Sequence, residues 1–249
     1  MSQEILAPSL GIDHPTVKGV IRIANEILNE GRRLNIEYLY RRAKRELKIP
    51  REGLLTIIQY LVNKKIIING SKFTIDTILD NEIRNLVYKI IQENIGLHFS
   101  AIKRNIVKIM KGSQIGVGQL IWHLEMLLKF NMIKCFELGN HTIFIPVEDD
   151  EKIAKIYYLA RNIVRNKILR YFIENERTTR PVIPEEIQEN RENVYYHIKI
   201  LIEHKCIISI NKELFLNPEI KHQIIKALQD LSSNQKLNYK VELKRELKK

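Results

Sequence analysis

The sequence contains only two cysteines, Cys135 and Cys206, among its 249 residues. Two such distant cysteines make neither a disulfide framework nor the spacing of a zinc site, and we expect both to be small buried residues in a reducing compartment. The opening residues show no charged-then-apolar signal pattern, and no apolar run approaches the roughly 20 residues of a membrane span. We therefore expect a soluble cytoplasmic protein without a metal site, associated with the nucleoid if it binds DNA.

Sequence motifs of enzymes and of nucleotide-binding proteins are missing as well. There is no phosphate-binding glycine loop, no nucleophile elbow and no carboxylate pair at a convincing spacing. Gly112, Gly116 and Gly118 imitate a loose glycine loop, but no strand precedes them and no lysine follows, so we interpret them as a turn and a site of close helix packing. Glycine and proline number only 10 and 7, which argues against long flexible linkers. We expect no catalytic residues, no cofactor and no enzymatic activity.

Acidic residues are outnumbered by basic ones, 29 to 41, which gives a net charge of +12. A basic excess of this size indicates an anionic partner, nucleic acid first and a membrane surface second, and the alternative is a merely lysine-rich solvated surface. The excess is uneven, with +4 in residues 1–80, +1 in 81–150, +3 in 151–217 and +4 in the final 32 residues. The nearly neutral second segment weakens the expectation that every part of the chain binds DNA.

What the sequence does contain is a threefold internal repeat. Apolar residues recur at i, i+4, i+7 and i+8, which is one stripe of an α-helix, and an apolar pair that begins a strand follows a short polar gap. A turn and a second apolar strand come after each pair, at 73–75, 142–145 and 214–216. The three copies of the pattern are Leu54, Ile58, Leu61, Val62, Ile66 and Ile67; Leu120, Leu124, Leu127, Leu128, Met132 and Ile133; and Val194, Ile198, Leu201, Ile202, Cys206 and Ile207.

Helix, turn and β-hairpin, three times over, predict a mainly α fold with small β-hairpin wings, built as three tandem winged helix-turn-helix domains. Winged helix 1 is expected in residues 1–79, winged helix 2 in 80–148, a connector helix with winged helix 3 in 149–217, and a C-terminal helix with a basic tail in 218–249. The expected helices cover residues 16–29, 34–47, 51–65, 82–93, 100–110, 115–130, 184–189, 191–205 and 219–231.

The longest helical pattern, in residues 149–176, exceeds what one winged helix needs. Its apolar residues recur at near-heptad spacing, so its first half is either a rigid connector or a dimer seam. We favour the connector and expect one continuous helix over 151–172. The apolar stripe of the last helix, at 220–231, either covers the core of the third domain or forms an interface. Together these two candidate seams lead us to favour a homodimer.

Two parts of the sequence resemble a known family. The first part consists of residues 96–100 and 117–124, and the second of residues 194–201. They are similar to the second and third helices of archaeal and other prokaryotic winged-helix regulators of the ArsR and MarR type. In that family the recognition helix reads aliphatic, polar, tyrosine or tryptophan, histidine, leucine. The resemblance implies a DNA-binding winged-helix fold, and it is weaker in the first domain, where Ile57 takes the place of the histidine.

The two histidines that carry this resemblance, His123 and His197, invite a metal-binding or catalytic interpretation. No aspartate, cysteine or second histidine lies at ligand spacing around either of them. We expect each histidine to donate a hydrogen bond to a backbone carbonyl or to a phosphate at the helix boundary. His98, Phe99 and Trp122 are expected in the core of the second domain.

DNA binding needs cations for the phosphates and polar groups for the base edges. The candidates in the first domain are Arg41, Arg42, Lys44, Arg45, Arg51 and Lys72. The candidates in the second domain are Ser113, Gln114, Gln119 and His141. The candidates in the third domain are Arg191, Asn193 and Tyr195, with Glu185, Glu186, Glu189 and Glu192 on the same surface. Those glutamates would repel phosphates and favour a protein partner at the third domain.

Two functions therefore stay open. The first is a DNA-binding protein, a transcription regulator that binds double-stranded DNA through its winged helices. The second is a scaffold of tandem winged helices that binds proteins, ESCRT-II-like or TFIIE-like. The basic first domain and tail favour the first function, whereas the neutral and acidic recognition helices favour the second.

Overall fold

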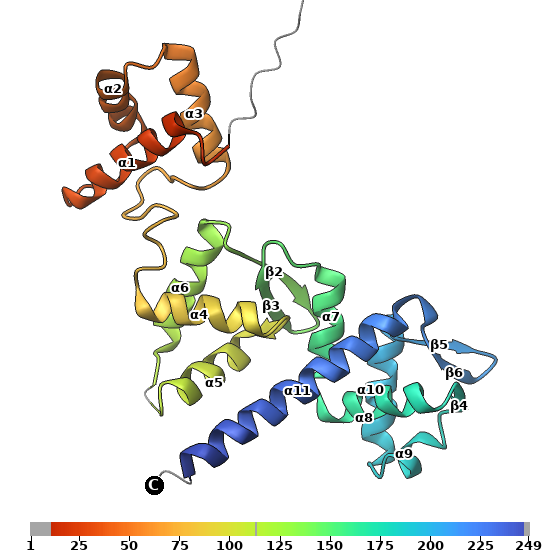
Figure 1. Ribbon diagram of the computed structural model, residues 1–249. Helices are drawn as coiled ribbons and strands as arrows, with labels where there is room; N and C mark the ends of the chain where they lie inside the picture. Colours follow the sequence, from red (N-terminus) through yellow and green to blue (C-terminus); the bar gives the residue numbers. More distant parts are fainter. Residues whose placement is uncertain (1–10, 113, 247–249) are drawn as a thin grey trace, which may run out of the picture. The chain divides into compact units, whose positions relative to one another are not determined.

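The computed structural model describes residues 11–112 and 114–246, with side chains up to residue 233. The protein is mainly helical and carries small antiparallel sheets, an arrangement compatible with winged helices (Figure 1). The chain divides into two compact units, the first of Met1–Ile90 with Ser100–Cys135 and the second of Ile91–Phe99 with Phe136–Lys249. Each unit has a hydrophobic core of its own.

Three helices form the first part of unit 1. They are α1 (Pro15–Asn29), α2 (Ile36–Leu47) and α3 (Arg51–Asn63), each within two residues of the prediction. α2 begins where the side chain of Asn35 accepts a hydrogen bond from the backbone N–H of Tyr38 at 2.8 Å, which satisfies one of the unpaired donors of its first turn. The apolar stripes of the three helices share one core, made of Val17, Val20, Ile23, Ala24, Ile27, Leu39, Ala43, Leu54, Ile57, Ile58 and Leu61.

The wing predicted after α3 does not form as strands, since residues 64–81 contain no strand. The chain does turn back on itself, and the backbone N–H of Ile75 donates to the carbonyl of Ile66 at 3.0 Å. The hydroxyl of Ser71 accepts from the backbone N–H of Phe73 at 3.0 Å, so a local side chain uses a donor that a ladder would need. The predicted strand at 73–75 is therefore wrong, although the return of the chain is present.

Unit 1 continues with three more helices. They are α4 (Glu82–Glu93), whose last residues belong to unit 2, α5 (Phe99–Ile109) and α6 (Val117–Lys129). The side chain of Asn81 accepts from the backbone N–H of Arg84 at 3.0 Å and so caps the first turn of α4. All three helices lie within two residues of their predicted positions.

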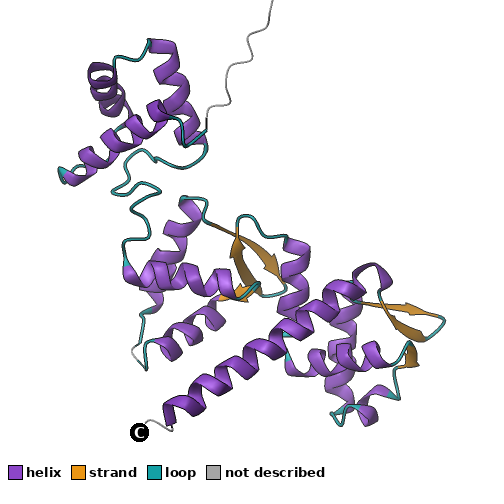
Figure 2. Ribbon diagram, viewed as in Figure 1, coloured by secondary structure: helices purple, strands orange, loops and turns teal. Residues whose placement is uncertain are grey.

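The two sheets have the same topology, and Figure 2 shows both hairpins. The strands are β1 (Leu97–His98), β2 (Ile133–Leu138), β3 (His141–Pro146), β4 (Arg177–Thr179), β5 (Ile207–Ile210) and β6 (Glu213–Leu216). Their orders are β1-β3-β2 and β4-β6-β5, so a short strand between the first two helices of a repeat pairs with the last strand of its hairpin. The hairpins were predicted. The strands β1 and β4 were not predicted, because a segment of two or three residues is too short to show the alternation of apolar and polar residues that indicates a strand.

The predicted connector is two helices, α7 (Glu151–Ala160) and α8 (Ile163–Glu174). Between them Asn162 is extended, with φ −71° and ψ 130°, and its side chain accepts from the backbone N–H of Arg165 at 3.0 Å. An asparagine that caps a new helix competes with continuation of the old one. The continuous helix predicted over 151–172 is therefore wrong, and the near-heptad spacing runs across a break.

The third repeat completes unit 2 after α8. Its helices are α9 (Ile183–Glu186), α10 (Arg191–Glu203), a 3-10 turn η1 (Pro218–Ile220) and α11 (Lys221–Glu246). α10 and its following hairpin lie within two residues of their predicted positions. α11 was predicted to end near residue 231, but it continues to Glu246.

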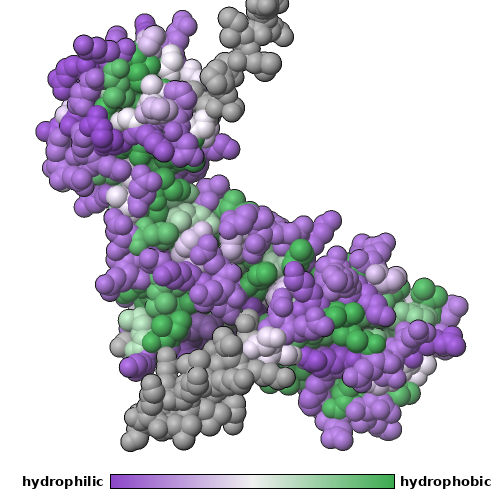
Figure 3. All heavy atoms as spheres, viewed as in Figure 1, coloured by the Kyte–Doolittle hydropathy of each residue, from purple (hydrophilic) through white to green (hydrophobic). Residues whose placement is uncertain are grey.

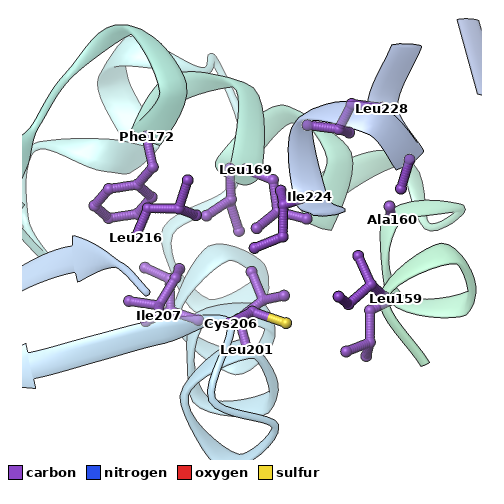
Figure 4. Close-up of a cluster of buried hydrophobic side chains, with 14 of the residues drawn as sticks. Leu159, Ala160, Leu169, Phe172, Leu201, Cys206, Ile207, Leu216, Ile224 and Leu228 are labelled. Atoms are coloured by element: carbon purple, nitrogen blue, oxygen red, sulfur yellow. The ribbon is translucent and has the colours of Figure 1, made fainter. Parts of the chain in front are cut away.

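α11 packs within unit 2 and contributes to its core. Figure 4 shows how its residues Ile224 and Leu228 face apolar side chains of the neighbouring helices and strands. On its polar side the hydroxyl of Tyr157 in α7 donates to a carboxylate oxygen of Asp230. The apolar stripe of α11 therefore covers the core of its own unit, which is the first of the two alternatives stated for it. α7 packs there as well, so both seams on which the homodimer rested are used within the chain.

Three predicted burials can be compared with the structure. Cys206 is buried, and burial raises the pKa of its thiol to about 12. Cys135 and Trp122 are exposed, so the expectation that they pack in a core is wrong. Among the described residues, no helix is long and apolar enough to cross a bilayer.

Candidate nucleic-acid interface

The basic residues predicted on α2 have two different environments. Arg41, Lys44 and Arg45 are exposed, and Arg41 makes an exposed ion pair with Glu37 one turn earlier, at 3.3 Å. Such exposed pairs contribute little to stability and are easily exchanged for another anion. These three cations are therefore accessible from solvent.

Arg42 lies among carboxylates instead. Its guanidinium bonds Glu46 of the same helix at 2.8 Å and Glu26 of α1 at 2.9 Å, and it also pairs with Glu30. Hydrogen bonds to Glu46 and Glu30 raise the pKa of Arg42 above its already high ordinary value. Its side chain is only 17% exposed. Arg42 thus ties α2 to α1, and its charge is already balanced.

The exposed side of α3 completes this surface. Arg51 stands at the first position of the helix, and Thr56 and Gln59 are exposed on the following turns. The N-cap, Pro50, offers no side-chain hydrogen bond to the first turn. Unpaired backbone N–H groups at a helix N-terminus attract phosphate. Thr56 and Gln59 were missed from the sequence, although their spacing opposite the buried stripe points to them.

The helix pair α5–α6 repeats this arrangement in the same register. Counted from the start of each helix, Arg104 corresponds to Arg41 and Lys108 to Arg45, and both residues are exposed. α6 also begins without a side-chain cap, at Gly116, and has no acidic residue in its first turn. The predicted Gln114 and Gln119 are exposed beside it, whereas Ser113 lies outside the described residues. Arg104 and Lys108 were missed because the nearly neutral charge of the whole segment hid a local cluster.

The third repeat differs at the same positions. The side chain of Asn190 caps α10 by accepting from the backbone N–H groups of Glu192 and Asn193, at 2.9 and 3.2 Å. Nε of Arg191 donates to the hydroxyl of Tyr195 at 3.1 Å, and its guanidinium lies over the same ring. The N-terminus of α10 is thus occupied by its own residues, which disfavours phosphate, whereas its first-turn glutamate does not distinguish it from α3, which carries Glu52 at the same position.

Two predicted residues lie outside the helices that would enter a groove. Lys72 is exposed in the turn that follows α3, and the carbonyl of the preceding Ser71 accepts from the backbone N–H of Leu34, just before α2, at 2.8 Å. His141 is exposed at the start of β3, and its ring lies 4.8 Å from that of His98. His141 belongs to unit 2, whereas the other predicted residues of the second repeat belong to unit 1.

A buried arginine–histidine pair occurs twice, at equivalent positions of two repeats. Arg84 is the third residue of α4 and His123 the seventh of α6, while Arg165 and His197 take the same places in α8 and α10. Each arginine follows an asparagine cap and donates to a carbonyl six residues earlier, Arg84 at 2.6 Å and Arg165 at 2.9 Å. In the first repeat the same two positions are occupied by Val17 in α1 and Ile57 in α3.

This arrangement corrects the expectation for the two histidines. Both nitrogens of His123 and Nδ1 of His197 are buried without a hydrogen-bond partner among the described residues. Burial first, and the neighbouring charge of Arg84 second, lower the pKa of His123 to about 4, and the pKa of His197 is lowered by burial and by Arg165. Neither histidine contacts solvent enough to bind a phosphate. No group of metal-ligating side chains occurs in the part of the chain that the structure describes.

No protein-family model matches the chain. Over 153 residues, which are 61% of its length, the chain is 29% identical to an uncharacterized HTH-type transcriptional regulator of Methanocaldococcus jannaschii. The matched stretch is 37% of that relative, so the chain spans little more than a third of the relative's length. At this coarse level, the similarity agrees with the resemblance to helix-turn-helix regulators that the sequence pattern indicated.

Proposed function

We propose that this protein is a transcription regulator that contains three winged helix-turn-helix domains in tandem and binds double-stranded DNA. The surface of α2 and α3 is the observation that carries the proposal. α2 exposes Arg41, Lys44 and Arg45, and α3, which packs against α2 and follows it after three intervening residues, starts without a side-chain cap and exposes Thr56 and Gln59. Cations and N–H groups fix a helix on the phosphates, and Thr56 and Gln59 are of the kinds that bond base edges.

Under this proposal the three repeats have different roles. α3 and α6 both start without a side-chain cap and follow helices with cations at equivalent positions, whereas Asn190 caps α10. The first two repeats therefore bind nucleic acid, and the acidic α9–α10 surface of the third does not. That surface supports a second role as a site for a protein partner, which keeps the scaffold function as a property of one domain.

The test is binding of the whole chain to labelled duplex DNA at several salt concentrations. Each phosphate contact contributes a slope of about −0.9 to log K against log salt concentration. Replacing Arg41, Lys44 and Arg45 together by alanine should weaken binding and flatten this slope.

A matched control removes three exposed cations of the third repeat, Arg180, Lys199 and Lys205, and should leave the slope nearly unchanged. Arg42 stays intact in both variants because it holds α1 and α2 together. If the two variants lose affinity equally, overall charge and not the α2–α3 surface binds the DNA, and the proposal fails.

A further inference from the structure

The only tryptophan of the sequence stands on the exposed face of α6. Trp122 is 44% exposed, and the adjacent Ile121 and Val117 are 43% and 51% exposed. Apolar side chains reach the surface over the region of α4 to α6 (Figure 3). Trp122 is the sixth residue of its helix, the position that Thr56 takes in α3. A large ring thus stands where the first repeat carries a small polar group.

The inner side of the indole is held by a stack of side chains. The guanidinium of Arg84 lies between two rings, 4.7 Å from the centroid of Phe73 and 4.8 Å from that of Trp122. Arg84 is fully buried, and it is fixed by the hydrogen bond to the carbonyl of Ile78. The rings of His123 and Trp122 are arranged edge to face, with their centroids 4.9 Å apart. The guanidinium of Arg84 thus covers one face of the indole, while 44% of the residue remains exposed.

The surroundings of this ring are cationic. Residues 99–131 contain five basic side chains and one acidic one, Glu125. Arg104 and Lys111 are exposed, and the uncapped start of α6 adds unpaired N–H groups. A surface of this charge repels a second copy of itself and attracts a polyanion.

A rigid exposed indole among cations fits an unpaired base better than a duplex. In a duplex the ring faces of the bases are stacked on one another, and a groove offers only base edges, which are read by hydrogen bonds. In a single strand the faces are free, and bases stack on aromatic side chains while cations follow the backbone. We propose that α6 and the cations of α5 form a second nucleic-acid site, which binds single-stranded DNA with a base stacked on Trp122. The inference rests on the proposed function only in that the second repeat uses the cation positions of the first.

The experiment uses the whole chain and a fluorescein-labelled oligothymidylate of about 15 nucleotides, in parallel with the duplex used above. The anisotropy of the label gives both affinities, and the fluorescence of the single tryptophan should be quenched by the oligothymidylate. Trp122→Ala should weaken binding of the single strand about 5- to 150-fold, the loss typical of one stacking side chain, with little change in duplex affinity. Trp122→Phe keeps a ring and should retain most of the affinity. Tyr196→Ala, at the same position of α10, is the matched control and should change neither affinity.

Three results would overturn the inference. One is unchanged binding of oligothymidylate by Trp122→Ala. Another is an equal loss for duplex and single strand with an unchanged circular dichroism spectrum, which would make Trp122 a groove contact. The third is a tryptophan signal that changes with protein concentration alone, which would make the surface a contact between copies. Loss of duplex binding in the α2 variant tests the proposed function independently, so the two failures are distinguishable.

Discussion

Protonation of His123 should destabilise the protein in mild acid. Its ring is buried beside the guanidinium of Arg84, so the native state keeps the imidazole neutral, with a pKa of about 4. In the unfolded chain the pKa is near 6.5, so unfolding takes up a proton between these two values. This contribution to stability is complete above pH 6.5 and is lost as the pH falls towards 4. The expected loss is about 2 kcal/mol at pH 5 and about 3 kcal/mol at pH 4.

The first repeat provides the control for this prediction. Val17 and Ile57 occupy the positions of Arg84 and His123 there, so the double variant Arg84→Val with His123→Ile transplants a pair that the fold already uses. Urea unfolding at pH 7.5, 5 and 4, followed by the fluorescence of Trp122, gives the free energy of unfolding around α6. The stability of the parent protein should fall more steeply with acid than that of the double variant.

The single variant Arg84→Val separates the two causes of the pKa shift. Because burial is the larger cause and the charge of Arg84 the smaller, the pKa of His123 should rise only part of the way towards 6.5 in this variant. Equal pH dependence of the parent and the double variant would refute the reasoning, since it would mean that His123 is already protonated or solvated in the native state.

Other predictions concern packing within each unit and the oligomeric state. Gly96 has φ +73°, and a Cβ there would lie 2.5 Å from the carbonyl oxygen of Ala154, so Gly96→Ala should destabilise unit 2 by at least about 1 kcal/mol, measured by circular dichroism in urea. Gly31→Ala is its control, since that glycine shares the positive φ but has no atom nearby. Arg42→Met should lower the melting temperature more than Arg41→Met does, because only Arg42 bridges two helices; equal melting temperatures would contradict this. Light scattering should give a monomer near 29.4 kDa, because most apolar residues of both predicted dimer seams pack into the core of unit 2, and twice that mass would contradict it.

The helices were predictable because each one carries a continuous apolar stripe with a period near 3.6. The break between α7 and α8 was not predicted, since the stripe runs through it and only the capping side chain of Asn162 marks it. The prediction of a wing after α3 was wrong for a related reason, because the hydroxyl of Ser71 accepts a hydrogen bond from the nearby backbone N–H of Phe73. In both places a short polar side chain decides the backbone, and hydrophobic periodicity does not register it.

The candidate site was predictable only where charge alone marks it. The basic cluster of α2 is visible in the sequence, but that Arg42 faces α1 depends on how two helices pack. Arg104 and Lys108 could be recognised only by aligning α5 with α2 residue by residue. Trp122 was assigned to the core because large aromatic residues are usually buried. Its exposure follows from its being one residue out of phase with the buried stripe of α6.

The arginine–histidine pair links the interior of a repeat to the surface that it presents. In the two repeats with the pair, an aromatic residue precedes the histidine, and its ring meets the imidazole edge at 4.9 Å for Trp122 and 5.1 Å for Tyr196. In both repeats the aromatic residue precedes the buried histidine by one position, so it lies outside the buried stripe of its helix and is exposed. The first repeat has Ile57 in place of the histidine and the small, exposed Thr56 before it. The buried arginine–histidine pair therefore occurs in the two repeats that expose an aromatic ring at this helix position and is absent from the repeat that does not.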